Sequence, residues 1–161
     1  MNARRLLLLA PLAALVAACA TPPASAPATV AETIARDPSL STLNSLVAQA
    51  GLADTLKAGG PVTVFAPTNE AFKAVPAKTL DELAHNPAKL KAVLSYHVVA
   101  ARVDAAHLKS GNLKSAQGAS LAIAKAGDYV TVEEAMVQAA DIAATNGVVH
   151  KVDRVLMPPK L

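Results

Sequence analysis

Four histidines and a single cysteine are the residues of this chain with the most obvious capacity for chemistry. Imidazole and thiolate groups bind metals, or act as bases and nucleophiles, when several of them converge. His85, His97, His107 and His150 lack the close spacing of paired ligands on one element. We therefore expect no metal site and no cofactor. We interpret His97 and His150 as partly buried side chains on strands that hydrogen-bond to the backbone or to a polar residue such as Asn69.

Other catalytic and nucleic-acid-binding patterns are missing from the sequence. It has no nucleophile elbow, dinucleotide-binding loop or phosphate-binding loop. Removing Arg4 and Arg5 from the 15 basic residues leaves 13 against 12 acidic ones, and there are two Tyr, two Phe and no Trp. Without a basic stripe or stacking aromatics, we expect no nucleic-acid binding. A Ser/His/Asp triad could still converge in space, so a hydrolase-type enzyme stays as a third hypothesis.

The first 18 residues have the pattern of a secretory signal peptide. Arg4 and Arg5 precede an apolar run from Leu6 to Ala18, which is shorter than the roughly 20 residues of a membrane-spanning helix. The residues just before Cys19, VAA, resemble the lipobox of bacterial lipoproteins. This resemblance implies that cleavage leaves Cys19 as the first residue, with lipid (palmitate among the acyl chains) on its sulfur and amine. The alternative is an ordinary cleavage site with a free or intermolecularly paired thiol.

A lipidated Cys19 predicts an exported protein of the cell envelope whose first partner is a membrane. Each buried CH₂ contributes about 0.8 kcal/mol, so two or three acyl chains anchor firmly. Ala20 stands where an aspartate would resemble an inner-membrane retention signal, which favours the outer membrane if the source is Gram-negative. Residues 20–28, ATPPASAPA, predict an extended linker, so that residues 19–28 form the lipidated cysteine and linker and residues 29–159 the domain.

Residues 63–72, TVFAPTNEAF, predict a strand that turns sharply into a helix. Val64 and Phe65 favour a strand, and Pro67 should end it near Ala66. Thr68 is then placed as a helix N-cap, and Asn69 can satisfy unpaired N–H groups of a helix. We interpret this stretch as a hydrogen-bonding hub, with Asn69 reaching toward His97 or His150.

The same ten residues closely resemble the first signature motif of fasciclin (FAS1) domains. Residues 144–158, ATNGVVHKVDRVLMP, resemble the second signature, and residues 94–98, LSYHV, resemble the Tyr-His segment of the family. The three occur in the family's order. The resemblance implies a single FAS1 domain: a small wedge-shaped β-sandwich with helices packed at one side and end.

The wider sequence pattern agrees with an α+β fold. Capping signals at Thr29, Asp37 and Asn86 predict helices in the first half, and alternating apolar residues beyond Asn112 predict strands in the second. The pair Asn146-Gly147 predicts a type I′ hairpin in which Asn146 adopts positive φ. The hairpin at residues 131–136, TVEEAM, should be looser or differently turned, because glutamate is poor at positive φ.

The resemblance also implies candidate interaction residues. Asp141-Ile142 matches an Asp-Ile pair, and Tyr96-His97 a Tyr-His pair, that are implicated in integrin adhesion by animal members. The alternative is that all four maintain the fold. We thus expect a monomeric, non-catalytic adhesion or interaction module with an unknown protein or cell-surface partner. The alternative function is a carrier of a small apolar ligand, lipid or carotenoid-like, as in some algal members.

Overall fold

The computed structural model describes residues 28–58 and 60–159. The predicted signal peptide, Cys19 and the linker lie outside the described residues. The helical half of the chain consists of α1 (Val30–Arg36), a short 3₁₀ helix η1 (Pro38–Leu40), α2 (Ser41–Gln49), α3 (Ala53–Ala58), α4 (Asn69–Lys73), α5 (Ala77–His85) and α6 (Pro87–Tyr96). None of the helices among the described residues has the length and apolar composition needed to cross a membrane.

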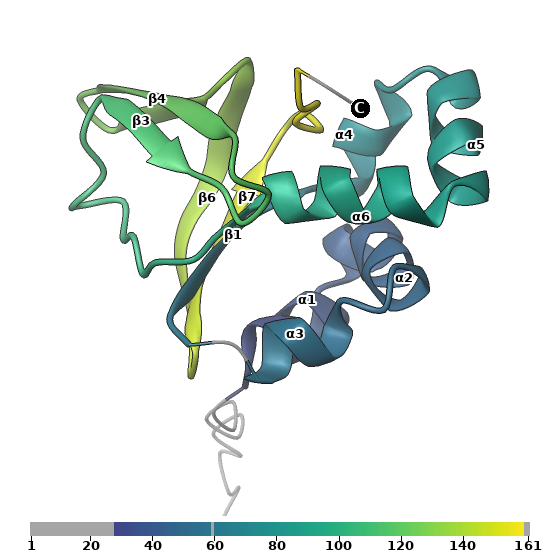
Figure 1. Ribbon diagram of the computed structural model, residues 1–161. Helices are drawn as coiled ribbons and strands as arrows, with labels where there is room; N and C mark the ends of the chain where they lie inside the picture. Colours follow the sequence, from purple (N-terminus) through teal and green to yellow (C-terminus); the bar gives the residue numbers. More distant parts are fainter. Residues whose placement is uncertain (1–27, 59, 160–161) are drawn as a thin grey trace, which may run out of the picture.

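The strands are β1 (Val62–Pro67), β2 (Val98–Val99), β3 (Gly111–Lys114), β4 (Ser120–Ala126), β5 (Tyr129–Val132), β6 (Ala135–Ala144) and β7 (Gly147–Val152). They form one sheet in the order β2-β1-β7-β6-β5-β4-β3, in which the β1–β7 pair is parallel and the other pairs are antiparallel. Figure 1 shows the sheet on one side of a wedge and the helices on the other. The predicted α+β class is confirmed.

The sheet curves until its two edges nearly meet. Val99 of β2 forms an isolated antiparallel bridge with Ser115, just beyond β3. The Ala116 N–H donates to the Val98 carbonyl at 2.6 Å. The expected sandwich is therefore a single seven-stranded sheet folded nearly into a barrel.

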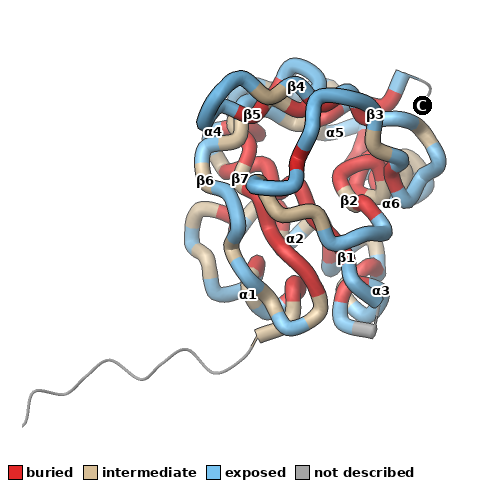
Figure 2. The backbone as a smooth tube through the Cα atoms, turned by 90° about the vertical axis from the view of Figure 1, so that its left-hand side faces the viewer, coloured by how far each residue is buried: buried red, intermediate tan, exposed pale blue. Residues whose placement is uncertain are grey.

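Two groups of buried residues hold the sheet and the helices together. One lies between the helices and the sheet and includes Ile34, Leu43 and Val64. The other fills the inside of the curved sheet and includes Phe65 and Val132. Neighbouring residues of β1 thus face different cores, and all six of its residues are buried. Figure 2 shows the largely buried backbone of the neighbouring strand β7 running through the centre of the molecule.

The predicted helix caps are confirmed. Thr29 and Glu32 form a reciprocal capping box at α1. The side chains of Asp37, Thr68 and Asn86 each accept a backbone N–H in the first turn of the following helix. Each of these caps satisfies a donor that a helix leaves unpaired, and all of them depend on residues within one turn.

The hairpin between β6 and β7 differs from the prediction. Ala144 pairs with Gly147, so the two loop residues are Thr145 and Asn146. Neither Asn146 nor Gly147 has positive φ. Gly147 lies in β7 beside Val62, and a Cβ on it would lie 1.9 Å from the Val62 carbonyl oxygen. The glycine is required by the close approach of two strands and not by a type I′ turn.

Asn146 has a role that the turn prediction did not anticipate. Its side-chain oxygen accepts the Val30 N–H at 2.8 Å, and its side-chain amide donates to the Leu56 carbonyl at 2.6 Å and to the Lys57 carbonyl at 3.3 Å. One side chain thereby ties the hairpin to the start of α1 and to the end of α3.

The hairpin between β5 and β6 has an unusual turn, as the sequence predicted. The turn nevertheless places a glutamate at positive φ, which the sequence argument had treated as unfavourable. Glu133 has φ of 54°. Its N–H donates to the Ala122 carbonyl at 2.7 Å, and its carboxylate accepts the Ala122 N–H at 2.7 Å. These two bonds to one residue of β4 offset the cost of a left-handed conformation in a residue that has a Cβ.

Candidate interaction surface

His150 lies at the centre of β7 and is fully buried. Its Nδ1 accepts the Asp141 N–H at 3.2 Å, and its Nε2 lies 2.8 Å from the Val103 carbonyl oxygen. Because one nitrogen accepts and the other donates, the bonds fit the neutral ring with its proton on Nε2. The ring also stacks on Phe65, with 5.5 Å between ring centres. His150 bonds to the backbone, and its partners do not include Asn69.

His97 is the C-cap of α6 and does not lie on a strand, contrary to expectation. Its Nδ1 lies 2.8 Å from the Val93 carbonyl oxygen, and its Nε2 accepts the Leu156 N–H at 2.9 Å. Complete burial lowers the pKa of His97 to about 4. The side chain therefore joins α6 to the C-terminal segment as a neutral ring.

Tyr96 is the last residue of α6 and is also buried. Its hydroxyl donates to the Ser120 carbonyl and to the Glu133 carboxylate, both at 3.3 Å. Burial, with the negative charge of Glu133, raises the pKa of Tyr96. Since Tyr96 and His97 are 2% and 1% exposed, the expected Tyr-His interaction pair offers no surface to a partner.

Asn69 does not reach either buried histidine. Its side-chain oxygen accepts the Thr42 N–H at 3.1 Å, and its amide donates to the Pro38 carbonyl at 3.0 Å. It does satisfy a free helix donor, as predicted, but the donor belongs to α2 and not to its own helix. Asn69 therefore positions α4 against the start of α2.

Asp141 and Ile142 lie in an irregular part of β6, where the register with β7 shifts between Ala139 and Ile142. Asp141 has φ of 57°, donates its N–H to His150, and accepts the Ala105 N–H on its carboxylate at 2.6 Å. Ile142 is half-buried and packs against the helix-side core. Of the Asp-Ile pair, only Asp141 is exposed.

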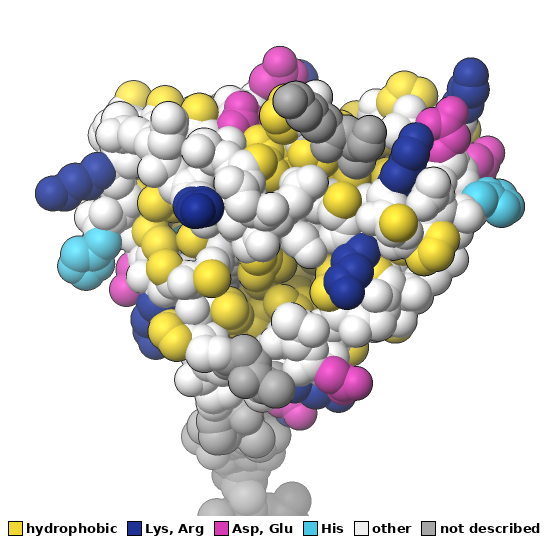
Figure 3. Space-filling view, viewed as in Figure 1, with side chains coloured by type: hydrophobic (Ala, Val, Ile, Leu, Met, Phe, Trp, Pro, Cys, Tyr) yellow, Lys and Arg dark blue, Asp and Glu magenta, His cyan; other side chains and the backbone are white. Residues whose placement is uncertain are grey.

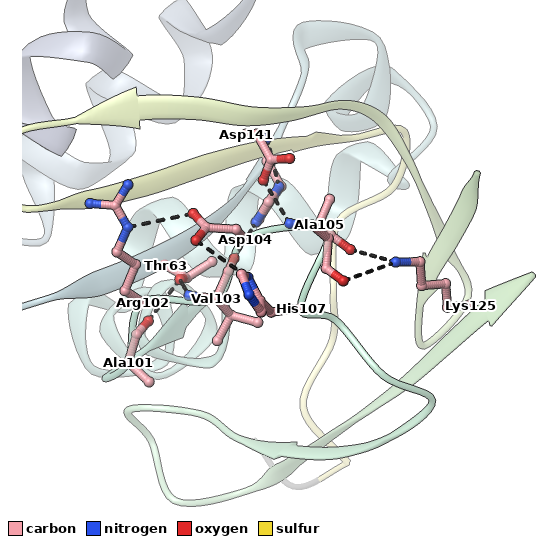
Figure 4. Close-up of polar contacts among 11 residues, drawn as sticks. Thr63, Ala101, Arg102, Val103, Asp104, Ala105, His107, Lys125 and Asp141 are labelled. Atoms are coloured by element: carbon pink, nitrogen blue, oxygen red, sulfur yellow. Dashed lines mark hydrogen bonds and ion pairs between the residues drawn. The ribbon is translucent and has the colours of Figure 1, made fainter. Parts of the chain in front are cut away.

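Asp141 is one of several residues that fix the segment 101–107, which we call the docked loop. Its anchors come from four strands (Figure 4). The Thr63 hydroxyl donates to the Ala101 carbonyl at 2.7 Å and accepts the Val103 N–H at 2.8 Å. The Lys125 ammonium donates to the Ala105 carbonyl at 2.7 Å. With His150 and Asp141, these bonds hold the backbone of a loop that has no regular secondary structure.

The docked loop exposes charged side chains of both signs. Asp104 lies 3.4 Å from the Arg102 guanidinium and 3.8 Å from the His107 ring, and the side chains of Arg102 and His107 are 51% and 82% exposed. Beside the loop is a cavity of about 190 Å³, lined by Ala105, Ala106, Lys125, Gly127, Asp128 and Val130. A rigid backbone with exposed charges and an adjacent hollow suits contact with another surface.

Sequence reasoning missed this loop, although its anchors left a signal. Thr63 is a polar residue inside the otherwise apolar run of β1. A buried hydroxyl requires a partner, so such a residue indicates a segment that must cross the strand nearby. Which segment it is depends on contacts distant in the sequence.

The described residues form no metal-binding cluster, and their buried polar side chains are paired. Within residues 28–58 and 60–159, no group of three or more His, Cys, Asp or Glu side chains is arranged to bind a metal ion. Every buried side-chain polar atom in the same part of the chain has a hydrogen-bond partner. Its buried polar groups are thus engaged in holding the fold.

Comparison with known proteins gives matches over most of the chain. The family model of the fasciclin domain matches residues 38–158. Protein sll1483 of Synechocystis is 43% identical over 133 residues, which cover 81% of this chain and 74% of that protein. Cell surface glycolipoprotein MPB83 of Mycobacterium bovis is 38% identical over 135 residues, or 81% of this chain and 60% of the relative.

A solved structure shows the same fold. A FAS1 domain pair from the insect cell adhesion molecule Fasciclin I superposes with a TM-score of 0.66 at 18% identity, covering 83% of this chain and 52% of that one. The family model spans well over half of the chain. This chain belongs to the fasciclin domain family.

Proposed function

We propose that this protein is an exported, non-catalytic interaction module that binds a protein or cell-surface partner through the docked loop and Asp141. The observation that carries the proposal is the anchoring of residues 101–107 by side chains of four strands. A loop that is already ordered loses little conformational entropy on binding. Its exposed Arg102 and His107 are then free to contact a partner.

Two relatives support a role outside the cytoplasm. MPB83 is named a cell surface glycolipoprotein, and the matching solved structure comes from a cell adhesion molecule. The signal-peptide pattern and Cys19 fit the same location. We therefore extend the proposal to a domain anchored in the cell envelope by lipid on Cys19, in the outer membrane if the cell is Gram-negative.

The adhesion proposal is tested by deleting the gene and restoring it with variants. We expect the deletion to reduce aggregation, biofilm formation or attachment, and the wild-type gene to restore it. The double variant Arg102→Ala, His107→Ala should fail to restore it while folding normally. The matched control is Lys91→Ala, His85→Ala, which removes one cation and one exposed histidine from α5 and α6 on the other side of the molecule (Figure 1). A deletion strain that behaves like the parent in all three assays would contradict the proposal.

The anchoring proposal has its own test. Cys19→Ser removes the only thiol that could carry lipid. We expect the variant protein to move from the membrane fraction to the soluble fraction. If it stays in the membrane fraction, lipid on Cys19 is not the anchor.

A carrier of a small apolar ligand is the second candidate. Figure 3 shows a hollow with hydrophobic side chains at its floor, between the sheet and the helices. A separate cavity among α1, α2 and α3 has a volume of about 170 Å³, below the roughly 300 Å³ at which ligand pockets begin. Colour or lipid that copurifies with the protein, detected by absorbance or native mass spectrometry, would favour this candidate over adhesion.

A further inference from the structure

Asn146-Gly147 is the only Asn-Gly pair in the sequence, and such a pair has a reactivity of its own. In an unrestrained chain the main-chain nitrogen of the glycine attacks the side-chain carbonyl carbon of the asparagine, because glycine has no side chain to hinder the approach. A C–N bond forms, ammonia leaves and a succinimide ring remains. Water then opens the ring at either carbonyl and gives aspartate or isoaspartate. One water molecule is consumed for each ammonia released, and nothing is oxidised or reduced.

The folded domain restrains the side chain that would react. The Asn146 side-chain oxygen accepts the Val30 N–H at 2.8 Å, and its amide donates to the Leu56 and Lys57 carbonyls at 2.6 and 3.3 Å. Ring closure requires the side-chain carbonyl carbon to turn onto the Gly147 nitrogen. The three hydrogen bonds to residues far away in sequence oppose that rotation, because it would leave their partners unpaired.

The peptide group that would supply the nitrogen is restrained as well. The Asn146 carbonyl accepts the Val62 N–H at 3.0 Å. Gly147 is buried and pairs with Val62 of β1 on one side and Ala144 of β6 on the other. Rotation of this peptide group would separate β7 from β1. The reaction therefore requires the hairpin to open away from β1, α1 and α3.

Neither product fits the place that Asn146 occupies. In the aspartate product a carboxylate, which only accepts hydrogen bonds, would face the Leu56 and Lys57 carbonyls. In the isoaspartate product the main chain runs through the former side chain and gains one carbon before Gly147. A Cβ on Gly147 would already lie 1.9 Å from the Val62 carbonyl oxygen, so the strands have no room for a displaced chain.

We propose that Asn146-Gly147 is a deamidation site that the folded domain protects, and that its reaction makes unfolding irreversible. The only co-reactant is water. Because the pair reacts only in molecules whose hairpin has opened, the extent of deamidation records how long the molecules have spent open. The site is independent of the proposed function, since neither residue belongs to the docked loop.

The full chain, incubated at pH 8 with and without guanidinium chloride above its unfolding midpoint, tests the protection. The tryptic fragment of residues 126–151 contains Asn146 as its only asparagine, and deamidation raises its mass by about one dalton. A synthetic peptide of residues 143–150 gives the rate of the unrestrained pair in each buffer. We expect the folded chain to react at least about a hundredfold more slowly than the peptide, and the unfolded chain at the rate of the peptide. Equal rates in the folded chain and the peptide would overturn the proposal.

Refolding of the aged chain tests irreversibility. Protein that has been deamidated in guanidinium chloride is diluted into buffer, and the folded and unfolded fractions are separated by size-exclusion chromatography. We expect the unmodified fragment in the folded fraction and the deamidated one in the unfolded fraction. Chains kept in guanidinium chloride for only a few minutes are the control and should refold. Deamidated chains that refold as well as unmodified ones would overturn this part of the proposal.

Two variants test whether local opening exposes the pair. Val30→Pro removes the N–H that bonds to the Asn146 side chain, at the first position of α1, where proline is favoured. We expect it to speed deamidation of the folded protein by about fivefold to tenfold, the factor that one hydrogen bond supplies. The matched control is Ile123→Val in β4, which lowers global stability by a similar amount from the other core and should leave the rate unchanged. Equal acceleration by both variants would overturn the local opening.

A folded Val30→Pro variant is required for that comparison, and urea unfolding checks it. If it does not fold, Asn146→Asp takes its place, because it creates one product of the reaction directly. We expect Asn146→Asp to lower the urea midpoint, whereas Asn112→Asp, at an exposed position on β3, should leave it unchanged. Equal midpoints for the two variants would contradict the misfit of the product.

Discussion

Gly147 and Val62 approach each other so closely across the parallel β1–β7 pair that a single methyl group would not fit between them. A Cβ on Gly147 would lie 1.9 Å from the Val62 carbonyl oxygen and 3.1 Å from a methyl group of Val30. The first neighbour is backbone in a central strand, which cannot move aside as a flexible side chain can. The position where α1 meets the two central strands is thus set by the absence of a side chain.

Gly147→Ala should therefore destabilise the domain by about 3 kcal/mol or prevent folding, because it forces two paired strands apart. Urea unfolding measures the effect. Gly60→Ala is the matched control: a Cβ there has no heavy atom within 4 Å, and its effect should stay within about 0.5 kcal/mol. Equal stability of the two variants would contradict the close approach.

Asn146→Ala should cost about 2–4 kcal/mol of unfolding free energy, because it removes bonds to Val30, Leu56 and Lys57 and leaves backbone groups unpaired. Asn112→Ala, at an exposed position on β3, is the control and should change stability by less than about 0.5 kcal/mol. If the two substitutions cost the same, Asn146 does not join the hairpin to α1 and α3.

Because burial lowers the pKa of His97, we expect the domain to lose stability in mild acid. The pKa falls from 6.5 to about 4, so between these values the unfolded chain binds a proton that the folded domain does not. Stability from this group is therefore complete above pH 6.5, falls as the pH drops toward 4, and levels off below that, with a total change of up to about 3 kcal/mol. Urea unfolding at pH 7 and pH 4.5 measures it.

His97→Gln should shrink the difference between those two pH values by about 2 kcal/mol. His85→Gln, at an exposed position on α5, should leave it unchanged. A His97 variant with the full pH dependence of the wild type would assign the acid sensitivity to another group.

Lys151 and Asp37 form a half-buried ion pair between β7 and η1, with side chains 21% and 22% exposed. Burial opposes ionisation of Asp37, yet bonds from Lys151 and Ser39 hold its pKa below its usual value. Lys151→Met should thus cost about 1–2 kcal/mol, because it leaves the carboxylate partly desolvated. Lys73→Met breaks an ion pair with Glu70 whose side chains are more than 70% exposed, and it should cost under about 0.5 kcal/mol in the same urea experiment.

The sequence predicted the features that depend on neighbours along the chain. Thr29, Thr68 and Asn86 cap helices as expected, because a cap and the donor it satisfies lie within three residues. The spacing of apolar residues also predicted the change from helices to strands along the chain.

The features that were mispredicted depend on contacts between distant residues. Asn146-Gly147 has the local pattern of a type I′ turn, but the approach of β1 decides the conformation of both residues. Asn69 lies in the first turn of its own helix yet bonds to α2. The docked loop is held by Thr63, Asp141 and His150, which are far from it in sequence, and periodicity carries no information on such pairs.

The nearly closed sheet has a consequence for crowded surfaces. Open strand edges allow neighbouring proteins to extend each other's sheets, and this hazard grows with local concentration. Here the bridge from Val99 to Ser115 and the bond from Ala116 to Val98 join the two edges where β2 meets the end of β3, so this part of each edge is not open to a neighbouring copy. Copies held side by side at high density should therefore find less free strand edge through which to extend each other's sheets.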